Sequence, residues 1–359
     1  MPLVSIITAH FERPALLKQA FAFLQRSTFG DWEWLIVDDG SSAPKWNEVR
    51  AMENDRRVRP LRRGTNIKGA SACRNFGLAR ASGDYIVILD DDDLLAPWCL
   101  EQRLAAVRSH NDAAMWVFPV LLFTRTPGDS DQYWNTMDLA RDDLERFLRS
   151  DGPWCVSSAL WRREALRTIG GFNEAVCYGD DCHLHLRALL ADLQVRQFPQ
   201  ALPDVFIRRG AETRITNSPS YALVESRRVF LEEATRLLRG AAVRPEYFKL
   251  WEGRYFVEAE FLLFNVAGSR AAIDRVLAEW QRHFRPGPAR RVVVRAYFRL
   301  ALACRRRAYL ALRIARRIAM RLLPPDYFPN RIPSRNAVAP ADTMHEVRAK
   351  LAAWSVHFA

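Results

Sequence analysis

Apolar residues along the first third of the chain fall into short continuous runs separated by amphipathic segments. The runs are rich in β-branched and aromatic residues, as in strands buried on both faces of a sheet, and cover residues 3–8, 33–37, 84–89 and 115–123. The amphipathic segments predict helices at residues 13–27, 70–81 and 97–110. Strands that alternate with helices indicate βαβ units, so the pattern predicts an α/β fold with a mostly parallel central sheet.

The pattern changes twice further along the chain. Residues 126–220 contain polar loops, a strand leading into a helix in "WCVSSALWRREAL" and a helix in "DDCHLHLRALLADL". From residue 221 onward the periodicity is helical almost throughout. We therefore expect an α/β domain over residues 1–220 and a helical C-terminal region over residues 221–359.

Composition narrows the class of protein. With 359 residues, 49% hydrophobic and 26% charged, the chain is typical of folded globular proteins. Its six cysteines are scattered without a C-x-x-C pair, which favours free thiols in a reducing compartment. No run approaches the ~20 apolar residues of a membrane span, and the first residues enter a strand pattern without a basic and apolar leader. We expect a cytoplasmic chain.

Each of the first three predicted strands ends in polar residues: "TAHFER", "DDGSS" and "DDDD". Ligands of open α/β sheets bind beyond the carboxyl ends of the strands, so the three clusters should meet. Residues i and i+2 share one face of a strand, which would turn Asp90 and Asp92 toward one site. Two such carboxylates suit Mg²⁺ or Mn²⁺, which takes one or two of them plus phosphate oxygens. The alternative is a solvated acidic turn that caps the following helix.

Four segments in order resemble family 2 of the inverting GT-A glycosyltransferases. They are the opening "VSIITAHFERPALL" with its "VDDGSS", the helix "GASACRNFG", the strand end "DYIVILDDDD" and the loop "GGFNEAVCYGDD". The resemblance implies a GT-A, Rossmann-like domain with a nucleotide-sugar-binding half over 1–125 and an acceptor half over 126–220. It also implies a nucleotide-sugar donor, with UDP as the expected nucleotide, and Mn²⁺ or Mg²⁺ as cofactor.

The family's motifs assign roles to individual positions. The resemblance implies donor contacts from Ala9, Glu12, Asp38, Asp39, Arg74, Asp90 and Asp91, a metal contact from Asp92, and catalytic roles for Asp180 and Asp181. Asp39 would accept a hydrogen bond from the base, with Asp38 supporting the turn, and Arg74 would meet phosphate at a helix N-terminus. Asp181 would be the general base that takes the acceptor's hydroxyl proton.

Several positions depart from the family's pattern. Ala9 and His10 stand where many relatives have proline and threonine, and Asp180 stands where a glutamate is usual. No histidine occurs in 206–218, so Arg208 or Arg209 would replace that contact. The Q-x-x-R-W motif of polymerising relatives is absent, which favours transfer of a single sugar. 

A metal cluster of Asp181, His183 and His185 is an alternative reading of "GDDCHLH". A helix there would turn His183 away from the other two side chains, which disfavours such a cluster.

The +12 net charge points to an anionic partner, and much of it lies between Arg285 and Leu323, where no acidic residue occurs. The spacing predicts one basic amphipathic helix over 290–323, with Arg295, Arg299, Arg306, Arg313 and Arg317 on one face. Such a helix suits an anionic membrane surface, which would make the protein peripheral on the cytoplasmic face. Alternatively, its apolar stripe packs on the catalytic domain. No recognition motif accompanies the charge, so we do not expect nucleic acid as a partner.

Two functions follow. The first is a metal-dependent inverting transferase that moves a hexosyl or N-acetylhexosaminyl group to a hydroxyl of a glycan or lipid-linked acceptor, in cell-surface polysaccharide or glycolipid biosynthesis. The second is an inactive binding or scaffolding protein with the same fold, for which the departures at Ala9 and Asp180 are weak support. The presence of Asp39, Asp92 and Asp181 favours the enzyme. A nucleotidyltransferase is disfavoured because no glycine-rich loop follows the first strand.

Overall fold

A seven-stranded sheet lies at the centre of the first two hundred residues of the computed structural model, which describes residues 3–64, 68–210, 221–304, 309–328 and 337–354. Its order is β3-β2-β1-β4-β8-β6-β9, and a smaller sheet has the order β5-β10-β7. Strands β1, β2, β3 and β4 are parallel, β6 is parallel to β9, and β8 runs antiparallel to β4 and β6. The predicted α/β fold with a mostly parallel sheet is confirmed.

The strands are β1 (Val4–His10), β2 (Trp32–Asp38), β3 (Val58–Arg62), β4 (Tyr85–Ile88), β5 (Leu94–Leu95), β6 (Met115–Val117), β7 (Val120–Phe123), β8 (Ala159–Arg162), β9 (Val195–Gln197) and β10 (Val205–Arg208). The helices of this part are α1 (Pro14–Leu24), α2 (Ala43–Arg50), α3 (Ala70–Leu78), α4 (Cys99–Ser109), α5 (Asp143–Leu148), α6 (Arg163–Thr168) and α7 (Asp180–Leu190). The C-terminal helices are α8 (Tyr221–Gly240), α9 (Pro245–Asn265), α10 (Arg270–Phe284), α11 (Pro288–Cys304), α12 (Tyr309–Leu322) and α13 (Ala341–Ala353).

Two strand predictions need correction, and in both cases a proline is involved. The single strand predicted over 115–123 is two strands, β6 in the central sheet and β7 in the smaller one, with Pro119 between them. Proline has no backbone N–H to donate to a strand ladder, and the chain changes sheets at this point. Strand β3, which contains Pro60, was not predicted; it lies at the edge of the sheet, where a proline is tolerated.

Two residues of the "CRNFG" sequence fix helix α3, one against the sheet and one against the segment before α7. A Cβ on Gly77 would lie 2.5 Å from Cγ2 of Ile7 in β1, so only glycine allows this approach. The amide of Asn75 donates to the carbonyl of Phe172 (2.9 Å) and accepts from the backbone N–H of Phe172 (2.8 Å). Asn75 thereby ties α3 to the segment that leads into α7.

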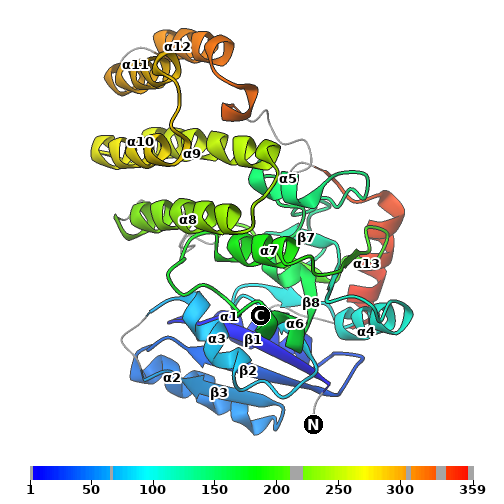
Figure 1. Cartoon of the computed structure of the whole chain (residues 1–359). Helices are drawn as coiled ribbons and strands as arrows, with labels where there is room; N and C mark the ends of the chain where they lie inside the picture. The colour runs from blue at the N-terminus through cyan, green and yellow to red at the C-terminus, as the bar shows by residue number, and fades with distance from the viewer. Residues whose placement is uncertain (1–2, 65–67, 211–220, 305–308, 329–336, 355–359) are drawn as a thin grey trace.

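The C-terminal helices form layers that extend away from the sheet (Figure 1): first α8, then α9 with α10, then α11 with α12. One buried hydrophobic cluster includes Ile88 of β4, Leu184 of α7 and Phe230 of α8, so the first layer shares its core with the central sheet. The boundary between the two regions was predicted at residue 220. Residues 211–220 lie outside the described part of the chain, so this boundary stays a prediction.

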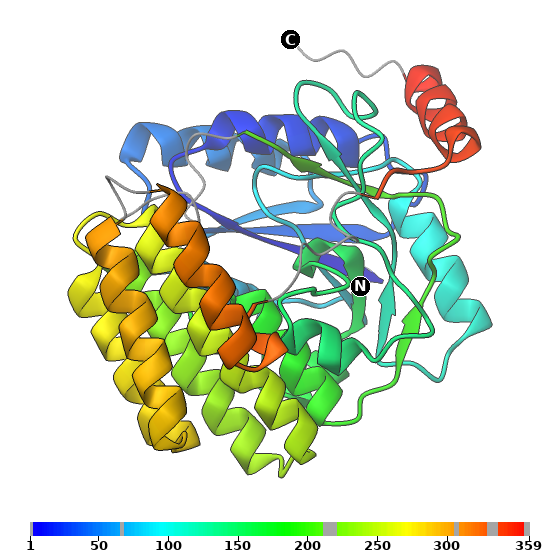
Figure 2. The ribbon, with the colours of Figure 1, turned by 90° about the horizontal axis from the view of Figure 1, so that it is seen from above.

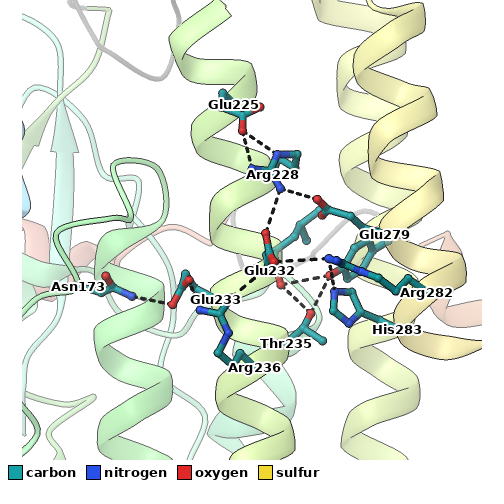
Figure 3. A network of polar contacts seen from close by, with 12 residues as sticks. Asn173, Glu225, Arg228, Glu232, Glu233, Thr235, Arg236, Glu279, Arg282 and His283 are labelled. Atoms are coloured by element: carbon teal, nitrogen blue, oxygen red, sulfur yellow. Dashed lines mark hydrogen bonds and ion pairs between the residues drawn. The ribbon is translucent and has the colours of Figure 1, made fainter.

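Ion pairs join the layers of this helical stack. Arg228 of α8 contacts Glu225 and Glu232 of its own helix and Glu279 of α10 (Figure 3). These hydrogen bonds raise the pKa of the Arg228 guanidinium. Burial by itself would raise the pKa of Glu232, but its contact with Arg228 helps to lower it. Arg228 is therefore one of the charged links between the first and second layers.

The basic segment 290–323 is a correction, because the structure has two helices where one was predicted. Helices α11 and α12 pack against each other at the end of the stack farthest from the sheet (Figure 1). A hairpin lets both helices bury an apolar side, which one long helix at this outer position could not do.

Among the described helices, none combines the length and the hydropathy that crossing a membrane requires.

The last helix, α13, lies on the side of the sheet away from the helical stack (Figure 2). Its Met344 and Val347 are buried in the second hydrophobic cluster with residues of α4 and β7.

All six cysteines belong to the described residues, and none forms a disulfide, as the scattered spacing predicted.

Candidate active site

A pocket of about 870 Å³ lies beyond the carboxyl ends of β1, β2 and β4. It collects eight of the ten residues to which the resemblance gave roles: Ala9, Asp39, Arg74, Asp90, Asp91, Asp92, Asp180 and Asp181. Glu12 and Asp38 are not among the residues that line it. The polar strand ends therefore meet at one site, as the rule for open α/β sheets requires.

The four consecutive aspartates form a turn and not a continuation of the strand. Strand β4 ends at Ile88, and the backbone N–H of Asp93 donates to the carbonyl of Asp90 at 3.1 Å. The two-residue alternation expected of a strand does not apply in a turn, and all four aspartates line the pocket. Asp90 and Asp92 do share one site, but the turn brings them there.

Asp91 is the most deeply buried of the four and is held by two residues of the "TAHFER" strand end to which the resemblance gave no role. Its carboxylate faces Nδ1 of His10 at 3.2 Å and accepts hydrogen bonds from Nε (3.2 Å) and Nη2 of Arg13. Nη1 of Arg13 also lies 3.5 Å from the carboxylate of Asp92. His10 and Arg13 thus hold the turn from the end of β1, at a distance in sequence that no local pattern reveals.

The "VDDGSS" turn separates its two aspartates. Asp38 is fully buried and accepts hydrogen bonds from the backbone N–H groups of Gly40 (3.1 Å) and Ser41 (3.0 Å), so it supports the turn. Asp39 lines the pocket, where its carboxylate accepts from Nη1 of Arg63 (2.9 Å) and from the N–H of Gly69 (2.8 Å). 

Glu12, assigned to the base pocket by the resemblance, points elsewhere. Its carboxylate accepts hydrogen bonds from the backbone N–H and the hydroxyl of Ser42, and its own N–H donates to Oγ of Ser41 at 2.9 Å. The left-handed backbone of Glu12 (φ 61°) turns the side chain toward α2. A donor contact from this carboxylate has no support in the geometry.

Arg74 connects the two halves of the pocket. From the first turns of α3, Nη2 of its nearly buried guanidinium contacts Asp90 at 2.6 Å, and Nη1 contacts Asp180 of α7. The hydroxyl of Ser71 donates to the same carboxylate of Asp180 at 3.2 Å. Asp180, to which the resemblance gave a catalytic role, is therefore held by Arg74 and Ser71.

Asp181 has the electrostatic surroundings of a base. It lies in the first turn of α7, where Oδ1 accepts from the N–H of Cys182 at 2.7 Å. Burial and the neighbouring charge of Asp180 raise the pKa of Asp181 to about 6. A carboxyl group with such a pKa is ionised at neutral pH yet more basic than an exposed aspartate, which suits general base catalysis.

The alternative metal cluster with His183 and His185 has no support, because both side chains are buried and neither is among the residues that line the pocket. His185 is fully buried and stacks on Trp161, with 6.0 Å between ring centroids and 2° between planes. Burial lowers the pKa of His185 to about 3 and that of His183 to about 4.

Of the two arginines proposed to replace a histidine contact, Arg209 lines the pocket, whereas Nη2 of Arg208 donates to Gln19 at 2.6 Å.

The charge of the pocket fits a divalent cation. Within the described part of the chain its lining has seven aspartates and four arginines, so it is acidic although the expected donor carries a diphosphate. No group of three metal-ligating side chains occurs among the described residues. Mg²⁺ or Mn²⁺ needs only one or two carboxylates when phosphate oxygens complete its shell, so Asp92 could hold it.

One wall of the pocket comes from the C-terminal helices, which the sequence analysis did not connect with the site. Phe230 of α8 and Arg254 of α9 both line it. Arg254 and Arg227 share the single carboxylate of Glu258, at 2.9 and 2.6 Å. This buried cluster has an excess of positive charge next to Tyr178 and Phe230 on the α7 side of the pocket.

Comparison with known proteins agrees with these features. The sequence profile described as "Glycosyl transferase family 2" matches residues 5–170. The chain is 30% identical over 190 residues to "O-antigen biosynthesis protein RfbC" of Myxococcus xanthus, covering 52% of this chain and 14% of the relative. It is 34% identical over 96 residues to "GalNAc(5)-diNAcBac-PP-undecaprenol beta-1,3-glucosyltransferase" of Campylobacter jejuni, covering 26% of this chain and 31% of the relative. The chain thus spans less than a third of the length of these curated relatives.

Among solved structures, the chain resembles residues 1–349 of S. aureus TarS in complex with UDP-GlcNAc. The TM-score is 0.66 at 15% identity, over 89% of this chain and 92% of the other. At this identity the likeness shows the fold.

Proposed function

We propose that this chain, a member of glycosyl transferase family 2, transfers a single sugar from a nucleotide sugar to a hydroxyl group of a glycan or lipid-linked acceptor. The observation that carries the proposal is the meeting of Asp92 and Asp181 in one pocket, with Asp181 made basic by burial and by Asp180. The named activities of the relatives, O-antigen biosynthesis and glucosyl transfer to a lipid-linked acceptor, support polysaccharide or glycolipid biosynthesis as its setting.

In the proposed reaction Asp181 acts on the acceptor. Its carboxylate takes the hydroxyl proton while the oxygen forms a bond to the anomeric carbon, and the bond from that carbon to the diphosphate oxygen breaks on the opposite face. The nucleoside diphosphate leaves with the bonding electrons, and the configuration at the anomeric carbon is inverted. Asp181 suits this role because it lines the same pocket as the aspartate turn and has a raised pKa.

The donor side of the proposal rests on Asp39, Arg74 and the aspartate turn. Asp39 would accept a hydrogen bond from the base, and uracil, which offers a ring N–H, makes UDP the preferred nucleotide. A divalent cation at Asp92 would supply the positive charge that the diphosphate needs in this acidic pocket. The N-terminus of α3, with Gly69 and Ala70 in the pocket lining, would present N–H groups to phosphate oxygens.

The acceptor side is proposed to include Phe230 and Arg254. An aromatic ring beside an arginine offers a stacking surface for a sugar and a charge for an acidic substituent or a lipid-linked diphosphate. This wall would make the helices α8 and α9 part of the catalytic unit.

The proposal is tested by incubating the full chain with a panel of nucleotide sugars, with Mn²⁺, with Mg²⁺ and with chelator, and measuring release of the nucleoside diphosphate. We expect metal-dependent hydrolysis of one donor, and none with Asp181→Asn at matched protein concentration. Absence of both hydrolysis and nucleotide binding in every condition would instead favour the binding or scaffolding protein.

A further inference from the structure

Exposed apolar side chains are concentrated at the outer end of the helical stack. Among the described residues, seven of the twelve exposed large hydrophobic side chains lie on α11 and α12. Four of them repeat every fourth residue along α12, namely Leu310, Ile314, Ile318 and Leu322, with exposed fractions of 50 to 70%. Residues four apart follow one side of a helix, so they form a continuous apolar row.

A neighbouring side of α12 accounts for its attachment to the protein. Ala315, Ala319 and Leu323 are buried in the main hydrophobic cluster. Arg316 donates from Nε and Nη2 to the carboxylate of Glu260 in α9, at 3.1 and 3.3 Å. The helix is therefore attached by other side chains, and the apolar row takes no part in this packing.

Arginines lie beside the apolar row. Arg317 and Arg321 are exposed and follow Ile314 and Ile318 by three positions, which places them next to the row on the helix surface. Arg291, Arg295 and Arg299 of α11 are exposed as well. No acidic residue occurs in the sequence between Arg285 and Leu323, so no carboxylate of this hairpin offsets their charge.

We propose that the outer face of α12, formed by its apolar row with Arg317 and Arg321, binds an anionic lipid surface. An apolar row enters the boundary between headgroups and acyl chains, while arginines beside it contact lipid phosphates. A second copy of this chain would bring the same basic face against itself, and like charges would repel. The combination of apolar and basic side chains thus fits an anionic membrane better than self-association.

The test is co-sedimentation of the full chain with vesicles of phosphatidylcholine alone or in equal mixture with phosphatidylglycerol, at low and high salt. We expect binding to the anionic vesicles that salt weakens, and little binding to phosphatidylcholine. The double variant Ile314→Glu/Ile318→Glu should abolish sedimentation. Arg317→Ala/Arg321→Ala should lower the partition coefficient by at least about tenfold, since each arginine near anionic lipid contributes ~1 kcal/mol.

Matched controls lie elsewhere on the surface. Leu139→Glu changes an apolar residue that is 67% exposed in the acceptor half, and Arg50→Ala/Arg56→Ala removes two exposed arginines near α2. Both controls should sediment like the parent, and thermal unfolding would show that all variants fold. 

Equal binding to both vesicle types, no binding to either, or equal loss in the controls would each overturn the proposal. So would a dimer in light scattering that Ile314→Glu/Ile318→Glu dissociates while vesicle binding is absent. Vesicle binding needs neither donor nor transfer, so its outcome is independent of the test of the proposed reaction.

Discussion

Arg74 and Asp180, 106 positions apart in the sequence, form an ion pair that joins the donor side of the pocket to the first turn of α7. The same guanidinium contacts Asp90, so one buried cation compensates two carboxylates. Burial by itself would lower the pKa of Arg74, but the charges of Asp180 and Asp90 raise it, and the side chain stays charged.

Replacement of Arg74 by methionine should damage both stability and catalysis. It leaves two partly buried carboxylates without their cation, and breaking such a pair typically costs ~3–5 kcal/mol. We expect a lower midpoint in urea unfolding and weaker donor binding by calorimetry. Arg80→Met, at an exposed arginine just after the same helix, is the control and should leave both close to the parent. Unchanged stability in Arg74→Met would mean that the pair contributes little.

The pH dependence should separate the two aspartates of α7. The pKa of Asp181 is raised to about 6 from an ordinary value of 3.8, first by burial and then by the charge of Asp180. A base must be ionised, so kcat/KM should rise as pH increases through about 6 and then level off. Asp180→Asn removes the second cause and should move this midpoint to lower pH, whereas Asp181→Asn should lower the rate by at least ~100-fold at every pH. 

A midpoint that does not move in Asp180→Asn would show that Asp180 does not act electrostatically on the base. If Asp180→Asn is inactive and Asp181→Asn active, the base is the other aspartate. Nucleotide affinity, measured in parallel, should stay near that of the parent in Asp181→Asn.

Asp92→Asn should remove the dependence of donor binding on metal. The variant lacks the charge that would hold a cation between the turn and the diphosphate, so Mn²⁺ should no longer increase nucleotide affinity in calorimetry. Asp84→Asn is the control, because its carboxylate is 71% exposed at the start of β4, away from the pocket lining. Equal Mn²⁺ enhancement in Asp92→Asn and in the parent would move the metal to another ligand.

Arg103 and Asp204 should contribute strongly to stability. Both side chains are fully buried, and Nε and Nη2 of Arg103 each contact Asp204 at 2.8 Å. Arg103→Met leaves the carboxylate of Asp204 buried without its partner and should lower the free energy of unfolding by ~3–5 kcal/mol in urea titration. Arg108→Met, exposed on the same helix, should change it little.

The double variant Arg103→Met/Asp204→Leu completes this experiment. Because it replaces both charges by apolar groups, it should recover much of the loss. A double variant no more stable than Arg103→Met would show that the arginine's other contacts matter more. These are hydrogen bonds to the carbonyls of Ser157 (2.9 Å) and Ala159 (3.1 Å).

The sequence alone determined the α/β class, the three strands that carry the polar ends, and the collection of most candidate residues in one pocket. Burial on both faces makes a strand continuously apolar, and this pattern is local enough to read directly. Parallel strands direct their carboxyl ends to one edge, so the sequence is enough to bring Asp39, Arg74 and the four aspartates to one site.

Only the tertiary structure decided which partner each polar side chain meets. Periodicity tells which side of a helix is apolar but not what covers it, and so it could not show that His185 stacks on Trp161 or that Arg254 reaches the pocket from α9. A backbone turn directed Glu12 toward Ser42. The same limit applies to the basic segment, where packing of α11 against α12 buries one side of α12 and leaves its apolar row exposed, because helix pairing depends on contacts between residues far apart in the chain.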